Sequence, residues 1–245
     1  MAQVVIVTGG AGGIGSAVCR ALAQDGLNVA IADFNTDAAI HLADEICKEG
    51  GEALALQADV GEKASVDSMA EKVLERYGQI DFLLNGAGVR TIAPIMHMTE
   101  EEWDWVLKIN LKGVFLCSQV VGAHMLGRKE GRIINIASGR GVVGGRGERG
   151  ESHYAASKGG VIAFTKSLAK ELAPYSILVN AIAPGRTDTS MARGGYTEGE
   201  WNKVAALPPL MGGLTQKEEI VGLIRYLLSD AARYVTGQFF LLRTP

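Results

Sequence analysis

Short, fully apolar runs alternate with helical segments along the chain, and this alternation limits the fold more than any other feature of the sequence. Such runs predict strands at 4–8, 28–32, 53–57, 82–84, 132–137, 177–182 and 238–242. Apolar residues at helical spacing predict helices at 14–24, 37–48, 63–77, 100–110, 113–126, 154–172 and 216–229. Strands that are apolar on both faces and separated by helices indicate a parallel sheet covered on both sides. We therefore expect an α/β, doubly wound fold with a mostly parallel, seven-stranded sheet.

The alternation contains no linker, so we expect a single domain over 1–245. The alternation of predicted strands and helices is interrupted only at 187–213, a stretch with several glycines after the sixth predicted strand. Because ligands of doubly wound folds bind at the carboxyl ends of the strands, we expect this stretch to form a substrate lid there. We also expect Thr36 to cap the second helix and Gly50 with Gly51 to end it.

A glycine-rich turn follows the first predicted strand. The segment from Gly10 to Gly15 matches G-x-G-x-x-G and lies between a strand and a helix, which is the context that this pattern requires. Backbone N–H groups at a helix start can hold a pyrophosphate, and the helix dipole favours its negative charge. Asp33 ends the next predicted strand, where a carboxylate can accept hydrogen bonds from an adenosine ribose. The pattern predicts a dinucleotide site, and a tight turn without a ligand is the alternative.

Composition argues against several other classes of protein. The net charge of −3 lacks the basic footprint of a phosphate-backbone binder, so we expect no nucleic-acid partner. The three cysteines have no CxxC spacing and the four histidines are scattered, so we expect no metal site. No apolar run reaches the roughly 18 residues of a membrane span. The N-terminal segment lacks the basic region of a signal peptide, so we expect a cytoplasmic protein without a membrane partner.

Several motifs occur in an order that resembles the short-chain dehydrogenase/reductase family. They are Thr8-Gly9-x-x-x-Gly13-x-Gly15, Asn85-Gly86-Ala87-Gly88, Asn110, Ser138, Tyr154-x-x-x-Lys158, and Pro184-Gly185 with Thr189. The resemblance covers nearly the whole chain. It implies a Rossmann fold and an NAD-dependent enzyme that interconverts a secondary alcohol and a ketone. The catalytic set that it implies is Asn110, Ser138, Tyr154 and Lys158.

The spacing of Tyr154 and Lys158 supports a chemical argument of its own, because residues four apart share one face of a helix. A free phenol has a pKa near 10, too high for an effective base near neutrality. A nearby ammonium favours the phenolate and lowers that pKa. We therefore expect Tyr154 to exchange a proton with the substrate oxygen, to which Ser138 can also hydrogen-bond. By resemblance, Asn110 supports a proton relay to Lys158, and Lys158 also bonds the nicotinamide ribose.

The expected cofactor set combines the glycine turn with positions that the resemblance implies. Its members are Gly9, Gly13, Ile14, Gly15, Asp33, Asp59, Val60, Asn85, Gly86, Ala87, Tyr154, Lys158, Pro184, Gly185, Thr187 and Thr189. Asp59 on its own would equally well be a helix cap. Asp33 predicts a preference for NAD over NADP, because its charge would repel a 2′-phosphate. Gly12 and Phe34 offer no cation that would offset this repulsion.

The segment between Ser138 and Tyr154 is longer than is usual in the family and is rich in glycine and arginine. Loops placed beside a catalytic site commonly carry specificity, and cations there could bind an anionic group of the substrate. The candidates, two of which lie in or next to the expected lid, are Arg140, Arg146, Arg149, Arg186 and Arg193. A solvated loop whose charges serve solubility is the alternative.

Three functional classes compete. The leading one is the NAD-dependent dehydrogenase, acting on a small-molecule alcohol or ketone. The second is a 3-oxoacyl-carrier-protein reductase, because Arg128, Lys129 and Lys170 lie near where such relatives present basic residues. Asp33 counts against the second class, because those reductases usually take NADPH. The third is a nucleic-acid or regulatory binding protein, suggested by the arginines and glycines of 139–150 but weakened by Glu148 and by Glu151, which follows the segment.

The resemblance also implies a homo-oligomer, with a tetramer expected. The predicted helix 154–172 carries small residues that permit close helix packing, and they are Ala155, Ala156, Gly159, Gly160 and Ala163. A dimer is the fallback, because the C-terminal residues 239–245 depart from the usual end of the family. If the small residues pack only on their own sheet, this argument for assembly fails.

Overall fold

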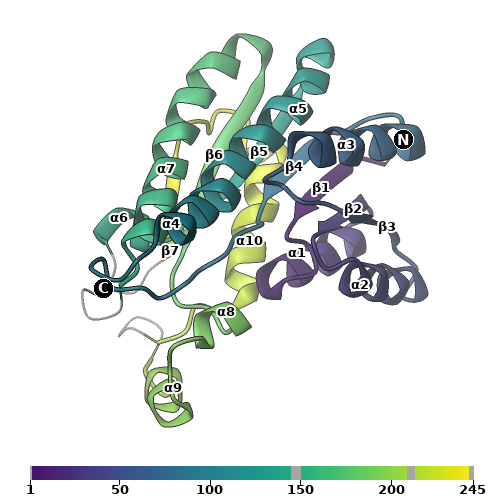
Figure 1. Cartoon of the computed structure of the whole chain (residues 1–245). Coiled ribbons are helices and arrows are strands. Elements are labelled where there is room, and N and C mark those ends of the chain that lie inside the picture. The colour runs from purple at the N-terminus through teal and green to yellow at the C-terminus, as the bar shows by residue number, and fades with distance from the viewer. Residues whose placement is uncertain (1, 145–149, 209–212, 243–245) are drawn as a thin grey trace.

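Seven strands form one sheet in the computed structural model, which describes residues 2–144, 150–208 and 213–242 (Figure 1). The strand order is β3-β2-β1-β4-β5-β6-β7, and every neighbouring pair is parallel. The strands are β1 Val4–Thr8, β2 Asn28–Asp33, β3 Glu52–Gln57, β4 Phe82–Asn85, β5 Gly131–Ile136, β6 Ile177–Pro184 and β7 Phe239–Leu242. The predicted doubly wound α/β fold is confirmed, and the sheet is parallel throughout.

Strand β1 lies at the centre and pairs with β2 on one side and β4 on the other. The chain builds outward from β1 to β3, returns across β1 to β4, and then builds outward to β7. The direction therefore changes between β1 and β4, and ligands of such folds bind in the crevice at this point, outside the carboxyl ends of the strands. Thr8 ends β1 level with Ala32 and Asn85, so the strand ends that border the crevice are aligned.

Helices cover both faces of the sheet (Figure 1). They are α1 Gly13–Gln24, α2 Thr36–Lys48, α3 Lys63–Tyr77, α4 Glu100–Leu107, η1 Lys108–Lys112, α5 Gly113–Arg128, α6 Arg140–Val143, α7 Ser152–Leu172, η3 Ala173–Tyr175, α8 Ser190–Arg193, α9 Glu198–Ala205, α10 Lys217–Leu228 and η5 Asp230–Ala232. Val4 and Ile6 pack with residues of α3 and α5, whereas Val5 and Val7 pack with α1, α2 and α10. Since successive side chains of a strand point to opposite faces, a strand between two helical layers must be apolar throughout.

Local boundaries differ from the expectations at three places. Asn35, rather than Thr36, caps α2, because its side chain accepts a hydrogen bond from the backbone N–H of Ala38 at 3.1 Å. The expected helices 100–110 and 113–126 are continuous through a five-residue π-helix, η1. The expected loop 139–150 begins with the short helix α6, and the stretch 187–213 contains α8 and α9.

The continuous helix formed by α4, η1 and α5 is long and apolar enough, by length and composition alone, to cross a membrane. Half of its most apolar window is buried inside the protein. Val114, Cys117 and Val121 of this helix belong to the buried clusters on the sheet. Packing in the core therefore accounts for the buried half of this window.

Candidate active site

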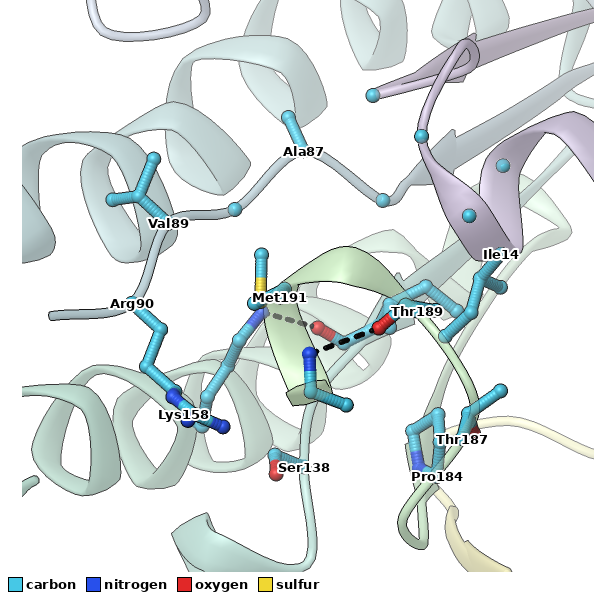
Figure 2. Close-up of a pocket in the computed structure, with 18 of the residues that line it drawn as sticks. Ile14, Ala87, Val89, Arg90, Ser138, Lys158, Pro184, Thr187, Thr189 and Met191 are labelled. Carbon is cyan, nitrogen blue, oxygen red and sulfur yellow. Dashed lines mark hydrogen bonds between the residues drawn. The ribbon is translucent and has the colours of Figure 1, made fainter. Parts of the chain in front are cut away.

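A cavity of about 710 Å³ lies at the carboxyl ends of the strands, on the crevice between β1 and β4. Figure 2 shows Ile14, Ala87, Ser138, Lys158 and Thr189 around it. The predicted residues that line it are Gly9, Gly13, Ile14, Gly15, Asp33, Asp59, Val60, Gly86, Ala87, Ser138, Arg140, Tyr154, Lys158, Pro184, Gly185, Arg186, Thr187 and Thr189. Three predicted residues do not line it, and they are Asn85, Asn110 and Arg193. Arg146 and Arg149 lie outside the described residues.

The turn between β1 and α1 is closed by backbone, and glycine is required at two of its positions. Gly9 has a φ of +66°, and an added Cβ would lie 2.7 Å from the Cα of Ala87. A Cβ on Gly15 would lie 2.2 Å from the carbonyl oxygen of Gly9. Helix α1 starts at this turn with no acidic residue in its first turn and with Gly12 as its N-cap. Its first N–H groups therefore face the cavity without a competing side chain, which fits the phosphates of a dinucleotide.

Asp33 lies at the end of β2, beside the glycine turn. Its carboxylate accepts hydrogen bonds from the backbone N–H groups of Ala11 at 3.0 Å and Asn35 at 2.9 Å. These bonds fix the carboxylate in the cavity wall, next to the side chain of Phe34, which is 73% exposed. A carboxylate held in this way fits an adenosine ribose. Asp59 also lines the cavity. Its Oδ1 accepts a hydrogen bond from the N–H of Gly61 at 2.9 Å, so it stabilises the local turn as well.

Tyr154 and Lys158 project from α7 into the cavity, and Ser138 reaches it from the end of β5. Lys158 donates a hydrogen bond from Nζ to the carbonyl oxygen of Ile136 at 2.8 Å, and Nζ lies 6.0 Å from the centroid of the Tyr154 ring. Ser138 Oγ accepts a hydrogen bond from the N–H of Arg140 at 3.2 Å. The three side chains thus meet at one end of the cavity, on the side away from Asp33.

Burial dominates the protonation of this group. It raises the pKa of the Tyr154 phenol, while Ser138 and the positive charges of Arg90 and Arg140 act in the opposite direction. Burial lowers the pKa of the Lys158 ammonium to about 8. The expectation that Lys158 lowers the pKa of Tyr154 is therefore wrong for this arrangement. The reason is that burial of the phenol outweighs the opposing effects of Ser138 and the two arginines, and Lys158 is not among the groups that shift this pKa.

Asn110 does not line the cavity and lies behind its wall. Its Oδ1 accepts a hydrogen bond from the N–H of Val89 at 2.8 Å, and its Nδ2 donates to the carbonyl oxygen of Val89 at 2.9 Å and to Ser157 Oγ at 3.1 Å. A Cβ added to Gly88 would lie 3.3 Å from Asn110 Oδ1 and 3.5 Å from Lys158 Nζ. Asn110 and Lys158 therefore approach each other across a bare glycine, which is compatible with a relay between them.

Asn85 has a structural role in the core. It is buried, and its Nδ2 donates to Asn135 Oδ1 at 2.8 Å and to Ser118 Oγ at 3.1 Å. Its successor Gly86 lines the cavity and donates its N–H to Thr8 Oγ1 at 3.1 Å. The end of β4 is thereby fixed against β1 and β5.

The predicted arginines have separate environments. Arg193 binds Asp188 through Nε at 2.6 Å and Nη2 at 2.8 Å, while Arg186 lies 5.5 Å from the centroid of the Tyr196 ring. Arg140 pairs instead with Glu151, with 3.1 Å between its Nε and Oε2 of the carboxylate.

Several cavity residues were missed by the sequence analysis, and two of them directly follow the motif at the end of β4. Arg90 pairs with the same glutamate, 3.4 Å from Nε to Oε1, and it lines the cavity. Val89 also lines it. Their position directly after the Asn85-Gly86-Ala87-Gly88 motif was the available signal, since the carboxyl end of a central strand borders the ligand crevice.

A family model of short chain dehydrogenases matches residues 3–198. The chain belongs to the short-chain dehydrogenase family. A protein of Synechocystis sp. named 3-oxoacyl-acyl-carrier-protein reductase is 43% identical over 242 residues, which cover 98% of this chain and 94% of that protein. A 3-oxoacyl-acyl-carrier-protein reductase of Thermotoga maritima is 38% identical over 96% of this chain and 94% of its own length.

Solved structures agree with this assignment. The crystal structure of gox2181 superposes with a TM-score of 0.93 at 35% identity, covering 99% of this chain and 95% of that one. A short-chain type dehydrogenase/reductase from Mycobacterium marinum gives a TM-score of 0.90 at 33% identity, covering 99% and 94%. The family resemblance inferred from the motifs is confirmed. This short-chain dehydrogenase is an oxidoreductase of a family that uses nicotinamide cofactors.

Proposed function

We propose that the protein is an NAD(H)-dependent reductase of 3-oxoacyl substrates, which it converts to the corresponding 3-hydroxyacyl compounds. One observation carries the redox chemistry: Ser138, Tyr154 and Lys158 line the same cavity as the glycine turn and Asp33. The 3-oxoacyl class is supported by the names of relatives that match almost the whole chain. Interconversion of other secondary alcohols and ketones is the broader alternative, and the relatives support it less well.

The side chains of the site suit the direction of reduction. A bound nicotinamide cofactor supplies or accepts the hydride at the substrate carbon. Ser138 holds the substrate oxygen, and Tyr154 donates its proton to that oxygen as the carbonyl becomes an alcohol. Because burial raises the pKa of the phenol, Tyr154 keeps this proton at neutral pH and is ready to act as the acid.

The proposal includes NAD(H) rather than NADP(H). A 2′-phosphate at about 4 Å from the Asp33 carboxylate would meet a repulsion of about 4 kcal/mol per unit charge at an effective dielectric of 20. Gly12 and Phe34, the neighbours on the cavity wall, carry no cation. The relatives' names do not state a cofactor, so this part of the proposal depends on Asp33.

A free thioester suits this chain better than a carrier-linked one. Arg128 donates from Nη2 to Asp81 Oδ1 at 2.6 Å and from Nη1 to the carbonyl oxygen of Ile80 at 3.3 Å. Asp81 lies just before β4, whereas Tyr154 works at the opposite, carboxyl end of the strands. The basic charge of Arg128 is thus engaged within the chain, and the exposed Lys129 and Lys170 lie near the ends of α5 and α7, at the amino end of the sheet and away from the cavity.

The decisive experiment follows cofactor absorbance with acetoacetyl-CoA, acetoacetyl-N-acetylcysteamine and a carrier-linked acetoacetyl group, each with NADH and NADPH. We expect reduction of the thioesters with NADH and a loss of reduction in Tyr154→Phe. Turnover of simple ketones with none of the thioesters would support the broader alternative. Reduction of the carrier-linked substrate alone would contradict the preference for a free thioester.

We also propose a cytoplasmic homo-oligomer, with a tetramer first and a dimer second. Ala156 and Ala163 are exposed on α7 and permit another helix to approach. Gly160 supports the alternative that the small residues pack only within their own chain, because a Cβ there would lie 2.8 Å from Leu111 Cδ2. Light scattering at micromolar protein tests the assembly, and a monomeric mass contradicts it.

A further inference from the structure

Two arginines and one glutamate form a cluster beside the catalytic residues. Arg90 follows β4, Arg140 begins α6, and Glu151 immediately precedes α7. The Glu151 side chain is 1% exposed, compared with 12% for Arg90 and 22% for Arg140. Both arginines line the cavity (Figure 2 shows Arg90 extending toward the side where Ser138 and Lys158 lie), whereas Glu151 lies behind it.

The cluster has one more positive than negative charge. Over the residues that the structure describes, Glu151 is the one carboxylate within 4 Å of either guanidinium. Neither contact has hydrogen-bond geometry, so the two carboxylate oxygens are neutralised without being hydrogen-bonded. A charge removed from water is unfavourable unless it is paired and hydrogen-bonded. An additional anion in the cavity would complete the pairing of the second cation.

The two arginines differ in how much of their hydrogen-bonding capacity is used. Arg90 also donates from Nη2 to the carbonyl oxygen of Gly194, so it ties the stretch after α8 to Glu151. Arg140 meets Glu151 through Nε, and its two Nη groups have no acceptor within the described part of the chain. A guanidinium with two adjacent N–H groups binds carboxylate or phosphate oxygens in pairs.

We propose that Arg140, supported by Arg90 and Glu151, forms a subsite for an anionic group of the substrate, a carboxylate or a phosphate. The inference rests on the proposed reduction of a ketone at Tyr154 and names a further feature of its substrate. Arg90 and Glu151 are positioning residues, and Arg140 makes the contact. Arg193 is excluded because Asp188 already accepts hydrogen bonds from both its Nε and its Nη2.

The charges of this cluster act on the phenol that exchanges a proton with the substrate oxygen. The charges of Arg90 and Arg140 lower the pKa of the Tyr154 phenol, and that of Glu151 raises it. An anion at Arg140 would therefore be near the carbonyl that Tyr154 protonates. This favours short substrates in which the anionic group and the ketone are separated by few bonds.

The experiment uses matched pairs that differ only in charge. Acetoacetate, 4-oxopentanoate and 5-oxohexanoate are each compared with their methyl esters, and the quantity measured is the ratio of kcat/KM for acid to that for ester. Acetoacetyl-CoA is compared in the same way with acetoacetyl-N-acetylcysteamine, which lacks phosphates. We expect Arg140→Gln to lower one of these ratios at least about tenfold, because a hydrogen bond to a charged group has about this effect on binding.

Two further variants test whether the change in the ratio is specific to Arg140 and whether it has the expected direction. Arg193→Gln removes a cation near the cavity that is committed to Asp188, so the ratio should stay as in wild type. Glu151→Gln keeps the shape of the side chain that positions Arg140 but removes its negative charge, so Arg140 is less neutralised and the ratio should rise. If Arg140→Gln does not fold, Glu151→Gln decides the matter, and an unchanged or lower ratio overturns the proposal.

The outcomes identify the source of the anion. A fall confined to the acid-to-ester ratios assigns the subsite to a carboxylate of the acyl group, and a fall confined to the CoA ratio assigns it to a phosphate. Equal effects on both members of every pair overturn the subsite. If the wild type reduces ketones but no thioester, the proposed function fails while the ratios still judge the subsite. If it reduces none of the compounds, both proposals fail.

Discussion

The two ends of the cavity are built in different ways. The end near Asp33 is made by consecutive elements, β1, α1 and β2, and by backbone that approaches too closely for a Cβ at Gly9 and Gly15. The end near Tyr154 joins side chains from segments far apart in the chain, such as Arg90 and Glu151. A site made of local backbone is visible in a short stretch of sequence, whereas one made of long-range side-chain pairs is not.

The largest expected effect is at the end of the cavity near Tyr154. Tyr154→Phe removes the proton donor, and general acid catalysis contributes roughly 10²–10⁴ in rate. We expect kcat to fall by this factor while NADH binding, measured by fluorescence titration, is unchanged. Tyr175→Phe, in the exposed η3, is the matched control and should keep its turnover. Near-normal turnover of Tyr154→Phe would contradict the assignment of Tyr154 as the proton donor.

The second effect concerns the backbone-built end alone. The repulsion estimated for Asp33, about 4 kcal/mol, corresponds to about three decades of preference for NADH over NADPH in kcat/KM. Asp33→Asn should reduce this preference at least about tenfold and leave the KM of the ketone unchanged. Asp37→Asn makes the same charge change on an exposed position of α2 outside the cavity and should have no effect. Equal use of both cofactors by the wild type would contradict the role of Asp33.

A third prediction tests the burial of Lys158. Its pKa is about 8 in the folded protein and 10.5 when unperturbed, so the unfolded chain binds more protons between these values. The free energy of unfolding should therefore rise from pH 8 to about 10, by about 2–3 kcal/mol relative to Lys158→Met. Urea denaturation across this range measures it. Lys166→Met, from the exposed face of α7, should keep the wild-type slope, and a slope that is the same in all three proteins would contradict the burial of the charge.

The smallest effect separates two kinds of glycine. Gly15→Ala places a methyl group against the carbonyl of Gly9 and should lower the free energy of unfolding by about 1–3 kcal/mol and weaken NADH binding. Gly222→Ala, in α10, meets nothing within 4 Å and should raise stability by about 0.5–1 kcal/mol. Thermal unfolding with and without NADH distinguishes them. Identical behaviour of the two variants would refute the close approach.

The parts of the molecule that sequence predicted best are those fixed by local rules. The strands could be placed because residues such as Val4 and Val5 must be apolar on both faces. The cap of α2 was misplaced by one residue, because Asn35 and Thr36 are both capping residues and only the backbone decides between them. The chemical motifs located the cavity wall, with Asn85 and Asn110 lying behind it.

The remainder depended on three-dimensional contacts. Glu151 looked like an interruption of an arginine-rich stretch, yet it is buried between two arginines, one of them 61 residues away along the chain. The pKa of Tyr154 depends on how burial competes with the Ser138 hydroxyl and with charges from other segments, and the spacing of Tyr154 and Lys158 reveals none of these effects. The signal at Lys158 was likewise incomplete, because its hydrogen bond to Ile136 follows from the position of β5.

The π-helix η1 has a consequence for how this enzyme can change. A π-turn accommodates one more residue than the regular helix on either side, so it sets the rotational phase between α4 and α5. Each residue of an α-helix turns the chain by about 100°. Deleting one residue within α4 or α5 would therefore rotate the side chains on one side of the deletion relative to the other, whereas deleting one from Lys108–Lys112 would convert the π-turn to a regular turn and leave the two helices in phase. The chain should therefore tolerate the loss of one residue here better than elsewhere in this helix, although the wide turn that carries Asn110 would be lost.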